Sequence, residues 1–225
     1  LPQIFIHPAT ERLDPEFVKR IQKGLLTEGL ASCRLSIAVV GPMYGGSLPS
    51  AGYLERALTS LGHRILYVDN SVAWSFHQTL TTTVNSRRAS NCVTDQLVSL
   101  LGEWAYARVM EFCPDICIVM AQAPVSQSFP IRLRQAGIVT AYWFIENWRH
   151  LRYWKDIAPL YDCFFHIQQG SFEDQLKQIG CANAAFVQTG CDPLIHTPVN
   201  LTDRERNEYD CDISFAGAGY PNRNR

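Results

Sequence analysis

A short polar segment follows the most apolar stretch of the chain. Residues 138–145 read IVTAYWFI, and residues 146–150, ENWRH, come directly after them. Partial burial at the end of such a strand raises the pKa of a carboxylate toward the working pH, which suits a general base that removes a proton from a hydroxyl group. Glu146 is therefore the leading candidate for a catalytic base, and His150, expected one helical turn later, is the second candidate.

The same segment also has a structural interpretation. Asn147 is a residue type that caps helices, so it can begin a helix without contacting any ligand. The basic residues that follow then form a solvated helix face: Arg149, His150, Arg152 and Lys155. The sequence leaves both interpretations open.

A second candidate loop, PMYGGSLPS at 42–50, follows an apolar run. Gly45 and Gly46 let backbone amides approach a ligand near a helix N-terminus, with Tyr44 and Ser47 beside them as further cleft-lining candidates. The loop is neither G-x-G-x-x-G nor a P-loop, which disfavours dinucleotide and ATP sites of those types. A turn that needs a flexible backbone explains the two glycines equally well.

Two later loops have the same position after an apolar run. They are QQGS at 168–171 and GCDP at 190–193, from which Gln169 and Asp192 are taken as cleft-lining candidates. Such residues more often serve only the turn itself.

The region 142–165 is rich in aromatic residues, a composition that can indicate carbohydrate stacking. Strand and helix periodicity place most of these rings in the core, and Trp148 alone is kept as a candidate cleft residue. His166 lies within an apolar run and is interpreted as a hydrogen-bonded core residue. His77 has no assigned role.

The eight cysteines do not have the spacing of a zinc site. Several lie in apolar runs, where a thiol behaves as a small hydrophobic group, so reduced cysteines and no metal site are expected. They are Cys33, Cys92, Cys113, Cys117, Cys163, Cys181, Cys191 and Cys211.

Short apolar runs alternate with amphipathic stretches, which predicts an α/β fold with a Rossmann-like, doubly wound parallel sheet. The predicted strands are 36–41, 64–69, 115–120, 138–145, 163–168 and 183–189. Because parallel strands end at one edge, the loops that follow them are expected to line a common concave edge. Those loops are 42–50, 121–128, 146–150 and 168–171.

Helix signals separate the predicted strands. Apolar residues at helical spacing predict helices at about 50–61, 93–107 and 171–180. Ser50 is assigned as the cap of the first, and Ser171 with Asp174 as a capping box for the last. A leader helix is predicted over 14–29, and 70–90 is the longest stretch without a predicted element.

Composition narrows the class of partner. The 225 residues include 20 basic and 21 acidic residues, a balance that gives no field for steering the protein to nucleic acid or an anionic membrane. No apolar run approaches the roughly 20 residues that cross a bilayer, and the first residues lack the pattern of a signal peptide. A cytoplasmic protein with small or neutral partners is expected.

Three stretches together resemble a known family. They are TAYWFIENWRHLRYWKDIAPLYDCFFHIQQGSFEDQL, FVQTGCDPLIHTPV and YDCDISFAGAGYPNRNR. In order and spacing they look like the spore-maturation-type, CgeB-like glycosyltransferases. The resemblance covers about residues 36–225 and is most specific in the second half of the chain. It implies a GT-B architecture, in which two Rossmann-like domains face each other across a cleft.

The resemblance divides the chain into three parts. It implies a helical leader at 1–35, an acceptor-side domain at 36–200, and a linker at 201–225 that ends in the start of a donor-binding domain. Residues 212–216 are then the first strand of that domain. The loop after it would contact the donor diphosphate through Gly217, Gly219, Asn222, Arg223 and Arg225.

The resemblance also implies the chemistry. A nucleotide-diphosphate-sugar is the donor substrate, no cofactor is permanently bound, and the acceptor is a sugar, protein or small molecule that the sequence does not identify. The 225 residues alone are expected to be inactive, and Ile213 and Phe215 to be exposed for want of a companion sheet. The alternative is a non-catalytic, flavodoxin-like binding or interaction module, because a fold does not fix a function.

Overall fold

The computed structural model describes residues 34–181 and 183–214. Six parallel strands form one sheet in the order β2-β1-β3-β4-β5-β6. The α/β class and all six predicted strands are therefore confirmed, each within a few residues of its predicted bounds. The strands are β1 (Ser36–Val40), β2 (Arg64–Val68), β3 (Ile116–Met120), β4 (Val139–Phe144), β5 (Cys163–His166) and β6 (Ala184–Phe186).

The strand order reverses between β1 and β3. From β1 the chain first adds β2 on one side, and it then returns to add β3 on the other. In the register, Val40 at the end of β1 lies beside Val68 of β2 and Val119 of β3, so the three strands end at nearly the same level. This reversal creates a topological switch point, where open α/β sheets bind ligands.

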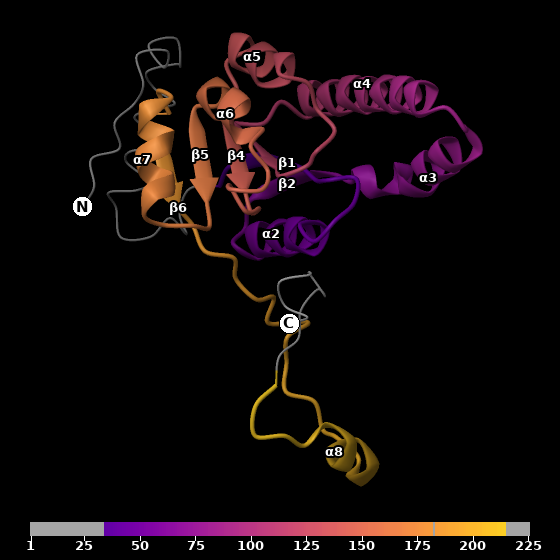
Figure 1. The fold of residues 1–225 in the computed structure, drawn as a ribbon. Coiled ribbons are helices and arrows are strands. Elements are labelled where there is room, and N and C mark those ends of the chain that lie inside the picture. Colours follow the sequence, from indigo (N-terminus) through magenta and orange to yellow (C-terminus); the bar gives the residue numbers. More distant parts are fainter. Residues whose placement is uncertain (1–33, 182, 215–225) are drawn as a thin grey trace. The chain divides into compact units, whose positions relative to one another are not determined.

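Helices cover both faces of the sheet, as a doubly wound fold requires. Helix α2 lies on one face, whereas α4 and α5 lie on the opposite face (Figure 1). Alternate strand residues face the two cores: Val39 and Met120 pack with α2, and Val40 and Val119 with the other layer. The helices are α2 (Leu48–Ser60), α3 (Trp74–Thr83), α4 (Arg87–Phe112), α5 (Ser128–Gln135), α6 (Trp154–Ile157), α7 (Ser171–Gln178) and α8 (Asp203–Tyr209).

The stretch 70–90, predicted to lack regular elements, is largely helical. It contains the 3-10 helix η3 (Asn70–Ala73), helix α3 and the start of α4. No residue of α3 is buried, and its threonine hydroxyls donate to carbonyl groups one turn earlier, as at Thr83. Of its side chains, Trp74 and Leu80 are partly buried against a small apolar cluster, and the prediction failed because two such residues among polar ones form too short an apolar pattern to detect. For the same reason α4 begins at Arg87 rather than near residue 93.

Both predicted helix caps are wrong. Helix α2 begins at Leu48, which places Ser50 inside its first turn. Gly170 precedes α7 with φ +81°, and no side chain caps that helix, so Ser171 and Asp174 form no capping box. A complete box exists instead at Thr202, at the start of α8.

A buried carboxylate joins the amino-terminal ends of β4 and β5. Asp162 Oδ2 accepts hydrogen bonds from Thr140 N at 2.8 Å and from Thr140 Oγ1 at 2.9 Å. Its other oxygen lies 3.0 Å from Nε of Arg134 on α5. The Asp162 carbonyl accepts from Asn183 Nδ2 at 3.0 Å, which extends the connection toward β6.

The chain divides into two compact units after Gly190. The second unit contains α8, and its residues Cys211–Ser214 form no strand. The predicted strand at 212–216 is thus absent over its described residues, since a strand without a partner leaves its backbone groups unpaired. Ile213 is 90% exposed, as predicted. Phe215, the leader helix and the predicted diphosphate loop lie outside the described residues.

Candidate functional site at the carboxyl edge of the sheet

The loops that follow β1 and β3 meet at the switch point. A Cβ atom placed on Gly45 would lie 2.7 Å from Gln122 Oε1, and Gly45 has φ +98°, so this position suits only glycine. Ser47 is buried, and its hydroxyl donates to the Ala121 carbonyl at 3.4 Å. Gly46 is exposed and has open space around it. Two of the four loops predicted to share an edge are therefore in contact.

Two carboxamide oxygens at this edge are buried without a partner in the described part of the chain. One is Gln122 Oε1, on a residue held in the left-handed conformation at φ +65°. The other is Asn70 Oδ1, whose amide nitrogen donates to the Gly41 carbonyl at 2.7 Å. Unpaired buried acceptors are costly, so their occurrence at a switch point marks a place where a hydroxyl or amine donor would be favourable.

Glu146 lies two residues beyond the end of β4, where the chain bends. The carboxyl group is half-buried, and this burial raises the pKa of Glu146, the direction that a general base requires. The Glu146 carboxylate interacts electrostatically with Tyr153. Burial raises the pKa of Tyr153, and the negative charge of Glu146 raises it further. Tyr142 Oη donates to Tyr153 Oη at 3.4 Å.

The residues after Glu146 form a turn and not the expected helix. Asn147 Oδ1 accepts from the Arg149 N–H at 2.9 Å, and the His150 N–H donates to the Asn147 carbonyl at 3.1 Å. Asn147 therefore caps a turn, whereas the structural interpretation had it cap a helix. His150 is exposed, as are the other three basic residues proposed for the solvated face: Arg149, Arg152 and Lys155.

Trp148 belongs to an aromatic cluster. Its ring stacks on Phe172 with centroids 5.3 Å apart and planes at 6°, and it meets Trp154 edge to face. The backbone N–H of Trp148 donates to Gln168 Oε1 at 3.0 Å, and this hydrogen bond joins the loops after β4 and β5. Gln168 makes this contact, whereas the predicted Gln169 is exposed. Trp148 is only partly accessible, because most of its ring packs against this cluster.

The remaining predicted site residues make contacts of their own. Tyr44 is 44% exposed and stacks on Trp74 with centroids 4.5 Å apart. Asp192 belongs to the second unit, where its Oδ1 accepts from the Leu194 N–H at 2.9 Å in a local turn. The predicted diphosphate residues are outside the described range: Gly217, Gly219, Asn222, Arg223 and Arg225.

His166 is a core residue, as its position in an apolar run predicted. It is almost fully buried, Nδ1 lies 2.8 Å from the Gln168 carbonyl oxygen, and the ring meets Phe172 edge to face. Burial lowers the pKa of His166, which keeps the ring neutral. The described residues contain no cluster of three or more histidine, cysteine or acidic side chains that could hold a metal ion.

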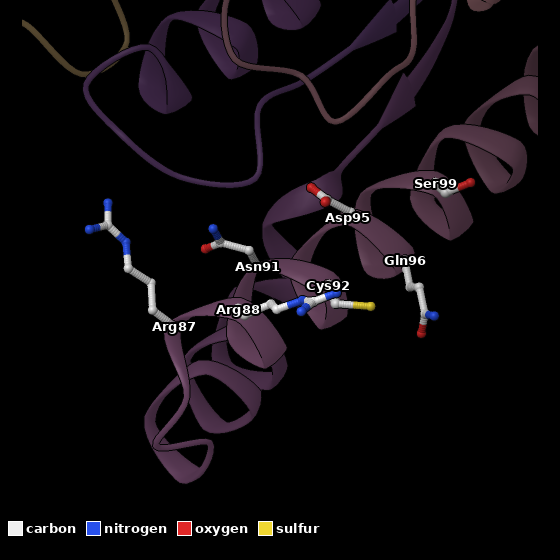
Figure 2. Close-up of a pocket in the computed structure, with 7 residues that line it drawn as sticks. All are labelled: Arg87, Arg88, Asn91, Cys92, Asp95, Gln96 and Ser99. Carbon is white, nitrogen blue, oxygen red and sulfur yellow. The ribbon is translucent and has the colours of Figure 1, made fainter.

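A separate hollow of about 710 Å³ lies along the amino-terminal half of α4 (Figure 2). All of its lining side chains come from this one helix, and all are exposed. This part of α4, together with α3, extends beyond the sheet (Figure 1). The hollow is therefore an open surface away from the switch point. It is lined by Arg87, Arg88, Asn91, Cys92, Asp95, Gln96 and Ser99.

Sequence reasoning pointed to the carboxyl edge but did not single out Asn70, Gln122 or Tyr153. The carboxyl-end rule pointed to the first two, because each comes within two residues of a strand terminus. Tyr153 was assigned to the core by periodicity, and no local signal indicated its proximity to Glu146.

Comparisons with known proteins do not place the chain in a family. Neither the protein-family models nor the curated proteins give a match. Among the described helices, none is both long and apolar enough to cross a membrane. A functional proposal therefore rests on the fold, the carboxyl edge and the resemblance noted in the sequence analysis.

Proposed function

We propose that this chain is the acceptor-side domain of a GT-B-type glycosyltransferase, which transfers a sugar from a nucleotide-diphosphate donor to an acceptor hydroxyl. The observation that carries the proposal is the position of Glu146. A half-buried carboxylate with a raised pKa lies at the carboxyl end of a central strand, on the sheet edge where α/β proteins bind ligands. The reaction class in this proposal comes from the resemblance of the chain's sequence to the CgeB-like enzymes.

In the proposed reaction the Glu146 carboxylate accepts the proton of the acceptor hydroxyl. The hydroxyl oxygen then forms a bond to the anomeric carbon of the donor, and the bond from that carbon to the diphosphate breaks. The nucleoside diphosphate leaves with the electron pair. A raised pKa favours this role because a carboxylate that holds its proton more tightly is a stronger base.

The switch-point loops supply the surroundings of the acceptor in this proposal. The unpaired oxygens of Asn70 and Gln122 are hydrogen-bond acceptors, so they suit a ligand that presents hydroxyl donors. Residues of the predicted diphosphate loop would contribute from the donor side, and no permanently bound cofactor is needed.

The test is transfer by the full-length protein, measured as release of nucleoside diphosphate from a panel of nucleotide-sugars. Glu146→Gln should lower turnover by about 100-fold or more while the fold and donor affinity stay nearly unchanged. Glu111→Gln, an exposed glutamate at the carboxyl-terminal end of α4, is the matched control and should keep full turnover. Full turnover in folded Glu146→Gln would remove Glu146 from the mechanism.

A second candidate is a non-catalytic, flavodoxin-like binding module. The strand order favours it, because β2-β1-β3-β4-β5 is the flavodoxin-like order and differs from the order of the dinucleotide-binding Rossmann fold. The same assay separates the two candidates. A binding module releases no nucleoside diphosphate from any donor, with or without Glu146.

A further inference from the structure

A cavity of about 250 Å³ lies between the loop after β3, the start of α5 and the segment from Tyr153 to Tyr161. It is separate from the exposed hollow on α4 and is more enclosed. A cavity of roughly 150 Å³ lined by apolar side chains is large enough to bind benzene in another protein. The space here therefore accommodates one substituted six-membered ring.

The walls of the cavity are mostly apolar. Val125 and Pro130 contribute from the β3–α5 side, and Ile157 and Leu160 from the opposite side. Tyr161 adds an aromatic ring that meets the ring of Tyr142 edge to face, with centroids 5.0 Å apart. Flat apolar and aromatic walls favour a ring with few polar groups, because each buried hydroxyl of a sugar would need its own partner.

Two tyrosine hydroxyls of the cavity form a hydrogen-bonded pair, and its other polar side chains are Gln122 and the exposed Ser126 and Gln127. Tyr142 and Tyr153 both line it, and the Tyr142 hydroxyl donates to the Tyr153 hydroxyl. Because Tyr153 already accepts the Tyr142 proton, its own hydroxyl proton is directed to a different acceptor. One ligand oxygen can fill that position.

The cavity carries no formal charge. None of the described side chains that line it is acidic or basic. Burial raises the pKa of Tyr142, Tyr153 and Tyr161, so these hydroxyls stay protonated at neutral pH. A charged ligand would lose its hydration here without gaining an ion pair.

We propose that this cavity binds an uncharged aromatic ring with a single oxygen substituent. The ring lies between the walls formed by Val125 and Leu160, and the oxygen accepts the Tyr153 hydroxyl proton. This inference concerns binding alone. It stands or falls independently of sugar transfer.

Phenol is the probe, titrated into ¹⁵N-labelled protein while amide chemical shifts are recorded. We expect saturable shifts in residues 122–127 and 153–161, with a dissociation constant on the order of 1–10 mM, as for a fragment of this size. Benzoate and methyl β-glucoside are the comparison probes. Each should bind at least about tenfold more weakly at pH 7, the first because of its charge and the second because of its several hydroxyls.

Two variants locate the site. Tyr153→Phe removes the hydroxyl and keeps the ring, and it should weaken phenol binding by about three- to tenfold, the contribution of one neutral hydrogen bond. Ala123→Phe places a second ring in the cavity and should abolish binding. Tyr209→Phe, which removes an exposed hydroxyl on α8, is the control and should leave binding unchanged.

Several results would overturn the proposal. They are the absence of saturable shifts, shifts confined to other regions, tighter binding of methyl β-glucoside or benzoate than of phenol, and unchanged affinity in folded Tyr153→Phe. If Ala123→Phe does not fold, Tyr153→Phe decides the question, because it changes only a hydroxyl that is not needed for ring packing.

Discussion

Replacing Asp162 with alanine should destabilise the sheet strongly. The substitution removes the acceptor of two short hydrogen bonds from Thr140 and the partner of Arg134. Breaking a buried ion pair costs about 3–5 kcal/mol, and the partial exposure of Arg134 lets water compensate some of this loss. We therefore expect the free energy of unfolding to fall by about 3 kcal/mol, a large fraction of the roughly 5–15 kcal/mol of a typical domain.

Urea unfolding followed by far-UV circular dichroism measures this loss. Asp95→Ala, on the exposed surface of α4, is the matched control and should change stability by less than about 0.5 kcal/mol. Asp162→Asn keeps an acceptor for Thr140 but not the charge, so its loss should be intermediate. A loss below about 1 kcal/mol in Asp162→Ala, with an unchanged m-value, would show that this carboxylate does not hold β4 and β5 together.

Three further predictions concern pH, thiol access and backbone strain. Because burial raises the pKa of Glu146, the charged carboxylate destabilises the folded state at neutral pH. Glu146→Gln should therefore raise Tm at pH 7. This gain in Tm should vanish as the pH falls toward about 4.3, where the carboxyl group is protonated in both states. A gain that persists at pH 4 would contradict this. In native protein, Cys117 and Cys181 should resist a thiol reagent, since burial raises the pKa of both thiols, while the exposed cysteines should react readily: Cys92, Cys113, Cys191 and Cys211. Gly45→Ala should lower Tm more than Gly137→Ala, because both have positive φ but only at Gly45 does the new Cβ meet a neighbouring side chain; equal losses would refute the contact with the β3 loop.

The sheet was predictable because its strands carry a strong local signal. Runs such as ICIVM at 116–120 and VTAYWF at 139–144 are nearly continuous in apolar residues, as strands covered on both faces must be. Helix α3 was not predictable in this way. None of its ten residues is fully buried, and only Trp74 and Leu80 pack against an apolar cluster, so its apolar pattern is too short to detect.

The candidate site was predictable in position but only partly in composition. Glu146 could be selected because a carboxylate directly follows a buried strand. Its relation to Tyr153 could not be predicted, because six residues separate the two and only the folded turn brings the two side chains near each other. The close approach of Gly45 and Gln122 is likewise a tertiary contact between loops distant in sequence.

The strand order has a consequence for how the molecule folds. Strands β1 and β2 are close in sequence: Leu35 and His63, which are hydrogen-bonded beside them, are only 28 positions apart, so the pairing of these strands closes a short loop. The pairing of β1 with β3 joins Ser36 to Asp115, which are 79 residues apart, and it carries the larger loss of chain entropy. We expect the pairing of β1 with β3 to form late in folding. The loops of Gly45 and Gln122 follow these two strands, so their contact at the switch point forms only when β1 and β3 have paired.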